Sequence, residues 1–127
     1  MARPPTIAIV DDDEGVRTSL ASLVRSLGYE ARTYGSGREF LDETLEAEPA
    51  CMIADIQMPA MTGDELQKSL NSAGRRFPII FMTAFPTDIV RQRVMAGGAH
   101  CFLNKPSDGD TIIRCLEDAL GAAAPAP

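Results

Sequence analysis

The sequence predicts a doubly wound α/β domain, in which helices cover both faces of one parallel sheet. The first reason is that short apolar runs alternate five times with longer stretches of helical periodicity, as in successive βα units. The second is that three of these runs are apolar throughout rather than alternating, as expected for strands buried on both faces. The third is the length of 127 residues, which accommodates one such domain but not two.

The predicted strands are runs of three to five residues with few charged side chains. They are residues 6–10, 30–34, 51–54, 79–82 and 101–103. After the first strand, apolar residues from Val16 to Leu27 recur at helical spacing, which predicts a helix with one buried face. Gly28 can end this helix, because glycine readily adopts the left-handed conformation that follows a last turn.

Capping residues predict where further helices begin. Ser36 and Thr62 are each followed three residues later by glutamate, which is the capping-box pattern of a helix start. Thr87 can cap a fourth helix that ends near residues 97–98, and apolar residues at helical spacing over residues 112–120 predict a fifth. One helix therefore follows each strand.

Composition limits the classes of function. Twelve basic against eighteen acidic residues give a net charge of −6, so we expect no direct nucleic-acid binding by this chain. With no apolar run of ~18–20 residues and no signal-peptide pattern, we expect a cytoplasmic protein without a membrane partner. Cys51, Cys101 and Cys115 lack metal-ligand spacing and are expected to be reduced core thiols. We expect one domain over residues 1–120 and a linker or disordered tail over 121–127.

Polar residues gather where the predicted strands end. They are Asp11, Asp12, Asp13 and Glu14 after the first strand, Asp55 after the third, Thr83 after the fourth and Lys105 after the fifth. Ligands of doubly wound sheets bind at this edge. Crowded carboxylates repel one another unless a cation lies among them, and oxygen ligands without a nearby histidine favour Mg²⁺. With Asp55 as nucleophile, Lys105 as a point charge and Thr83 as a hydroxyl donor, the pattern predicts phosphoryl transfer onto an aspartate.

These segments resemble the response-regulator receiver domains of two-component signalling, of the kind that often precedes a helix-turn-helix output domain. The resemblance covers residues 6 to about 120 and is carried by Ile9-Val10-Asp11-Asp12-Asp13, Ile53-Ala54-Asp55-Ile56-Gln57-Met58-Pro59, Met61-Thr62-Gly63, Met82-Thr83-Ala84 and Phe102-Leu103-Asn104-Lys105-Pro106. It implies a flavodoxin-like fold, a doubly wound five-stranded parallel sheet with five helices and strand order 2-1-3-4-5. It also implies a phosphoacceptor rather than an enzyme, with at most self-phosphorylation from small donors and autodephosphorylation.

The resemblance assigns roles to the acidic residues. A sensor histidine kinase would phosphorylate Asp55. Asp11 and Asp12 would form the acidic pocket, with Asp12 binding Mg²⁺ directly. The main-chain carbonyl of Gln57 would be another metal ligand, alongside Asp55.

A conformational switch is implied in the same way. Phe102 would swing inward when Thr83 moves toward the phosphoryl group, and the Lys105–Pro106 peptide bond would be cis, which only X–Pro bonds adopt at low cost. The output surface would be formed by helix four, strand five and helix five, roughly residues 87–119. It would control an output domain, a protein partner or a phosphorylation-dependent homodimer.

Other functions remain open at this stage. Asp11 and Asp13 also imitate the nucleophile motif of haloacid-dehalogenase-like phosphohydrolases, in which Asp11 would carry the phosphoryl group and Asp13 would be the general acid. A receiver-like interaction module that is never phosphorylated is another alternative. A flavin or nucleotide binder is disfavoured, because four negative charges in the first loop would face the ligand phosphate.

Overall fold

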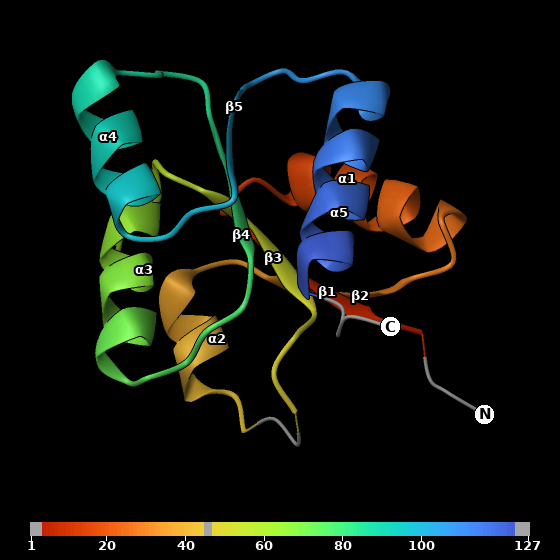
Figure 1. Ribbon diagram of the computed structural model, residues 1–127, viewed down its shortest axis with the longest axis horizontal. Helices are drawn as coiled ribbons and strands as arrows, with labels where there is room; N and C mark the ends of the chain where they lie inside the picture. Colours follow the sequence, from red (N-terminus) through yellow and green to blue (C-terminus); the bar gives the residue numbers. More distant parts are fainter. Residues whose placement is uncertain (1–3, 45–46, 124–127) are drawn as a thin grey trace.

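Five parallel strands form one sheet in the order β2-β1-β3-β4-β5 in the computed structural model, which describes residues 4–44 and 47–123 (Figure 1). The strands are β1 (Thr6–Val10), β2 (Glu30–Tyr34), β3 (Cys51–Asp55), β4 (Ile79–Thr83) and β5 (Cys101–Asn104). The predicted fold class and strand order are confirmed. The last three strands each extend one residue further than predicted, so Asp55 and Thr83 end strands instead of following them.

Helices cover both faces of the sheet. They are α1 (Glu14–Ser26), α2 (Gly37–Asp42), α3 (Gly63–Ser72), α4 (Asp88–Ala96) and α5 (Gly109–Ala123). In Figure 1, α1 and α5 lie on one side, and α2, α3 and α4 lie on the other. Helix α5 includes the first three residues of the segment expected to be a linker, 121–127; residues 124–127 lie outside the described residues.

The central strands contribute to two hydrophobic cores at once. In β1, Ile7 and Ile9 pack in the cluster that contains residues of α1 and α5. Ala8 and Val10, which point the other way, pack in the cluster that contains residues of α2, α3 and α4. All four are essentially fully buried, which is why this strand is apolar without alternation.

The helix starts follow the capping predictions with one correction. The Thr62 side chain accepts the Glu65 main-chain N–H, and the Glu65 carboxylate accepts the Thr62 N–H, so this capping box is complete. Ser36 accepts the N–H of Glu39 in the same way. The carboxylate of Glu39, however, accepts the N–H of Gly35 at 2.5 Å rather than that of Ser36, so the second half of this predicted box is wrong. The turn before α2 places the N–H of Gly35, rather than that of Ser36, within reach of the Glu39 carboxylate.

All three cysteines are free thiols, as predicted. Cys51 is buried in the hydrophobic core, and Cys101 and Cys115, which are partly buried, pack against the same cluster, so the expectation of core positions is confirmed for Cys51 and in part for the other two. Burial raises the pKa of the Cys51 and Cys101 thiols to about 12, which keeps both thiols protonated near neutral pH. In the described part of the chain, no helix has the length and apolarity that a membrane span requires.

Candidate functional site

Three aspartates meet at the carboxyl end of the sheet. Asp55 is the last residue of β3, and Asp11 and Asp12 directly follow β1. The two strands pair with Val10 opposite Ala54, so their ends are level. One carboxylate oxygen from each aspartate lies within 4.8 Å of the other two. Asp11 and Asp55 are buried and Asp12 is exposed, so the cluster opens to solvent on one side.

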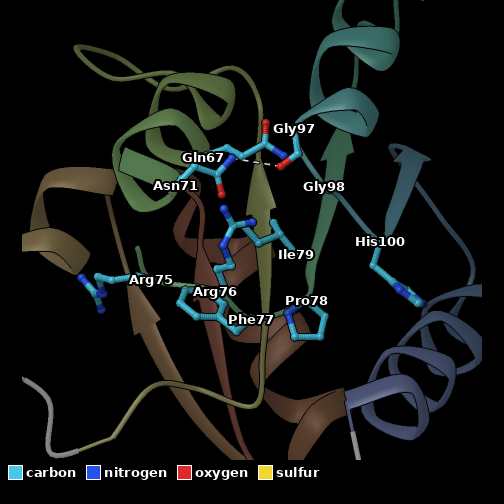
Figure 2. Close-up of a pocket in the computed structure, with 10 residues that line it drawn as sticks. All are labelled: Gln67, Asn71, Arg75, Arg76, Phe77, Pro78, Ile79, Gly97, Gly98 and His100. Carbon is cyan, nitrogen blue, oxygen red and sulfur yellow. Dashed lines mark hydrogen bonds between the residues drawn. The ribbon is translucent and has the colours of Figure 1, made fainter. Parts of the chain in front are cut away.

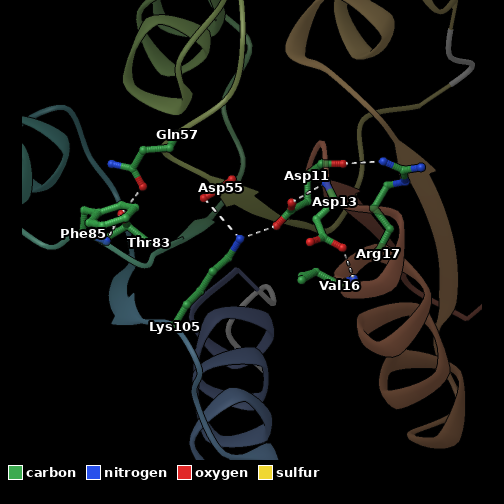
Figure 3. A network of polar contacts seen from close by, with 9 residues as sticks. All are labelled: Asp11, Asp13, Val16, Arg17, Asp55, Gln57, Thr83, Phe85 and Lys105. Atoms are coloured by element: carbon green, nitrogen blue, oxygen red, sulfur yellow. Dashed lines mark hydrogen bonds and ion pairs between the residues drawn. The ribbon is translucent and has the colours of Figure 1, made fainter.

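Lys105 supplies the positive charge in this cluster. Its Nζ lies 2.7 Å from Oδ2 of Asp11 and 3.3 Å from Oδ1 of Asp55 (Figure 3). The main chain of Lys105 is held at the end of the neighbouring strand, because its N–H donates to the carbonyl of Thr83 at 2.7 Å. The Lys105–Pro106 peptide bond is cis, as the resemblance implied.

The pKa values of Asp55 and Lys105 reflect crowding of negative charge. Burial raises the pKa of Asp55, and the negative charge of Asp11 raises it further, although Lys105 opposes both. For Lys105, burial lowers the pKa, but the bond to Asp11 and the charges of both carboxylates outweigh it, so its pKa is raised. One ammonium group therefore pairs with two of the three clustered carboxylates, Asp11 and Asp55.

Asp11 is held from three directions. Its Oδ1 accepts the N–H of Asp13 at 2.9 Å, and its Oδ2 accepts from Lys105. Nη1 of Arg17 donates to the Asp11 carbonyl at 2.7 Å. The carboxylate of Asp12, in contrast, makes no hydrogen bond to the part of the chain that the structure describes. Sequence reasoning missed Arg17, because an arginine in the first turns of an amphipathic helix has the pattern of an ordinary surface residue.

Beside the carboxylates, a second network surrounds Thr83. This residue ends β4 and is fully buried. Its hydroxyl donates to Oε1 of Gln57 and accepts the main-chain N–H of Phe85 at 3.0 Å (Figure 3). Phe102 lies on the neighbouring strand β5 and packs, partly buried, against the core. The resemblance implied a role for the main-chain carbonyl of Gln57. Sequence reasoning missed this side-chain hydrogen bond, because nothing in the residue spacing indicates it.

Two hollows lie beside these elements, and a third lies at the opposite edge of the sheet. A mainly apolar one of about 750 Å³ lies between α1 and α5 and reaches Lys105. Another, of about 500 Å³, is lined by residues of the loop before α4 together with α4, β5 and Phe102, within the predicted output surface. A third, of about 360 Å³, lies at the amino end of β4, the opposite edge of the sheet (Figure 2). There His100 pairs through Nε2 with Asp118 at 2.7 Å, far along the strands from the carboxylates.

Comparison with known proteins identifies the class. The family model of the response regulator receiver domain matches residues 7–117. The chain therefore belongs to the response regulator receiver domains, which act as phosphoacceptor signalling switches rather than as enzymes.

The similar curated proteins include a transcriptional regulatory protein and a nodulation protein. The chain is 36% identical over 118 residues to the transcriptional regulatory protein FixJ of Azorhizobium caulinodans, covering 93% of this chain and 56% of that protein. It is 37% identical over 117 residues to nodulation protein W of Bradyrhizobium diazoefficiens, covering 92% of this chain and 50% of that protein. The chain spans about half the length of the curated relatives it matches.

Solved structures share the fold over nearly the whole chain. The crystal structure of FixJ-N has a TM-score of 0.86 at 29% identity and covers 98% of this chain and 100% of that chain. The chemotaxis protein CheY4 of Vibrio cholerae has a TM-score of 0.84 at 29% identity, covering 92% of this chain and 99% of that chain.

Proposed function

We propose that this receiver domain accepts a phosphoryl group from a histidine kinase on Asp55, in a Mg²⁺-dependent reaction. Phosphorylation then changes the surface formed by α4, β5 and α5. The observation that carries the proposal is the cluster of three aspartates, with one oxygen from each within 4.8 Å of the others, in which two carboxylates pair with Lys105. Its excess negative charge suits a divalent cation and then a phosphoryl group.

The donor atoms of the cluster fit Mg²⁺. They are hard carboxylate oxygens, and no histidine or cysteine joins the group among residues 4–44 and 47–123. Asp12 and Asp55 are proposed as direct ligands together with the main-chain carbonyl of Gln57, and Asp11 as a further member of the pocket. Bound Mg²⁺ would neutralise negative charge on the phosphoryl oxygens.

The protein's own groups have complementary tasks in the transfer. A carboxylate oxygen of Asp55 attacks the phosphorus of the phosphohistidine, a P–O bond forms, the P–N bond breaks, and the electron pair leaves on the imidazole nitrogen. Lys105 remains protonated because its pKa is raised, so it can pair with one phosphoryl oxygen. Thr83 can donate its hydroxyl proton to another.

Contacts of the first loop favour Asp55 over Asp11 as the phosphoacceptor. Both oxygens of Asp11 already accept hydrogen bonds, one from Lys105 and one from the N–H of Asp13. Asp13, the general acid in the phosphohydrolase alternative, caps α1 by accepting the N–H of Val16 at 3.1 Å. These hydrogen bonds give Asp11 and Asp13 structural tasks that compete with a catalytic role.

The proposed output is control of an attached domain or a protein partner. FixJ is named as a transcriptional regulatory protein, and this chain matches about half of its length. The net charge of −6 disfavours direct contact of this chain with nucleic acid, so a transcriptional effect would be exerted through another domain or partner. A phosphorylation-dependent homodimer through the same surface would be detected as a change in solution size.

Labelling with a small phosphodonor tests the phosphoacceptor. Wild type and Asp55→Asn are incubated with radiolabelled acetyl phosphate, with and without Mg²⁺, and the labelled peptide is mapped. We expect Mg²⁺-dependent label on the peptide containing Asp55 and none in the variant. Label on the Asp11 peptide would indicate the phosphohydrolase, and absence of label from wild type would indicate an interaction module that is not phosphorylated.

A further inference from the structure

We infer that the Gln57 side chain is a positioning residue that holds the Thr83 hydroxyl in its unphosphorylated arrangement. In this way Gln57 sets how readily the domain responds to phosphorylation. The inference rests on the proposed function, since it concerns the hydroxyl expected to contact the phosphoryl group.

The argument begins with the single proton of the Thr83 hydroxyl. A hydroxyl group donates one hydrogen bond and accepts up to two. In the structure the donated bond goes to Oε1 of Gln57, and the N–H of Phe85 occupies one acceptor position at 3.0 Å. Thr83 therefore cannot donate to a phosphoryl oxygen until it has released Gln57. The two acceptors compete for one proton.

The location of the bond makes this competition effective. Thr83 is fully buried, whereas Gln57 is exposed in the loop after β3. Figure 3 shows the pair bonded to each other on one side of the cluster formed by Asp55, Lys105 and Asp11. The base of the loop is held in place, because the N–H of Ile56 donates to the carbonyl of Met82 at 3.1 Å. The glutamine side chain is thus supported close to the end of β4.

The side chain and the main chain of Gln57 can be tested separately. Gln57→Leu removes the side-chain acceptor and leaves the main-chain carbonyl, the proposed metal ligand, in place. A net hydrogen bond of ordinary strength corresponds to an effect of roughly 2- to 10-fold on an equilibrium. We therefore expect Gln57→Leu to bind a phosphoryl analogue about fivefold more tightly, with unchanged affinity for Mg²⁺ alone.

A double-mutant cycle with Thr83 distinguishes this positioning role from a general structural effect. The measurement is the dissociation constant of beryllofluoride in saturating Mg²⁺, by calorimetry, for wild type, Gln57→Leu, Thr83→Val and the double variant. We expect Gln57→Leu to tighten binding when Thr83 is present and to have no effect in the Thr83→Val background. Thr83→Ser, which keeps the hydroxyl, should restore the effect of Gln57→Leu and covers the case in which the valine variant folds poorly.

Gln92→Leu is the matched control, because Gln92 is exposed on α4 and its side chain makes no hydrogen bond to any residue that the structure describes. It should leave beryllofluoride affinity unchanged. Equal effects of Gln57→Leu with and without the Thr83 hydroxyl, or no tightening at all, would overturn the positioning role. In that case wild type still binds beryllofluoride and still takes label on Asp55. Failure of wild type to do either would overturn the proposed function as well.

Discussion

Replacing Asp55 by asparagine is expected to stabilise the domain when no divalent cation is present. The Lys105 ammonium attracts Asp55 across 3.3 Å by about 5 kcal/mol at an effective dielectric constant of 20. Asp11, with an oxygen within 4.8 Å, repels it by at least about 3.5 kcal/mol on the same scale. Asp12 repels it more weakly because solvent screens that exposed carboxylate.

These charge interactions nearly cancel, and the cost of burying the Asp55 carboxylate remains. That balance agrees with the raised pKa of Asp55, of which burial is the largest cause. An asparagine oxygen can still accept a hydrogen bond from Lys105 without carrying the charge. We therefore expect Asp55→Asn to raise the free energy of unfolding by about 1–2 kcal/mol, which is roughly 4–8 °C in Tm for a domain of this size.

The sign of the pH dependence follows from the same pKa. Because the pKa of Asp55 is higher in the folded than in the unfolded chain, the folded state takes up this proton first as the pH falls. The ionised carboxylate thus destabilises the fold above its folded pKa, and the penalty disappears as the pH falls through that value toward 3.8. The stability advantage of Asp55→Asn should therefore shrink as the pH falls toward 3.8 and be largest above the raised pKa of Asp55.

Thermal unfolding followed by circular dichroism, with EDTA and then with Mg²⁺, measures both effects. At a Mg²⁺ concentration ten times its dissociation constant, the free energy of unfolding of wild type should increase by about 1.4 kcal/mol. The variant should gain less, because it has lost a charged ligand. If Asp55→Asn is less stable than wild type in EDTA at pH 7, the assignment of a net penalty to the buried carboxylate is wrong.

Three further changes test the surroundings of the site. Lys105→Ala should keep the fold but lower the free energy of unfolding in EDTA by about 2–4 kcal/mol, because Asp11 and Asp55 then face each other without a cation. Urea unfolding should show a smaller decrease in Mg²⁺, and an equal decrease would contradict this account. Gly63→Ala should lower the free energy of unfolding by about 1–3 kcal/mol, because an added Cβ would collide with the carbonyl oxygen of Asp55. The same collision should weaken Mg²⁺ binding measured by calorimetry. Thr62→Ala should lower the free energy of unfolding in urea by about 1 kcal/mol, because α3 loses its N-terminal cap. Phosphorylation of Asp55 at the wild-type rate would confirm that the effect is structural.

Most of the architecture was predictable because it follows from periodicity. Strands buried on both faces are apolar without alternation, and each is followed by a helix whose start carries a capping residue. Boundaries were less certain, as at Asp55 and Thr83, because a polar residue at a strand end pairs in the sheet as readily as it begins a loop. The contact of Glu39 with Gly35 shows the same limit, since neighbouring amides compete for one carboxylate and only the turn geometry decides between them.

The sequence by itself determined which residues could share an edge of the sheet. In a parallel sheet every strand ends on the same side, so Asp11, Asp55 and Lys105 must come near one another once their strands are recognised. Only the tertiary structure decided that Asp12 stays exposed, and that Arg17 and Gln57 bind Asp11 and Thr83. The reason is that strand order places backbones, whereas a side-chain contact depends on rotamers and on the packing of residues far apart in the chain.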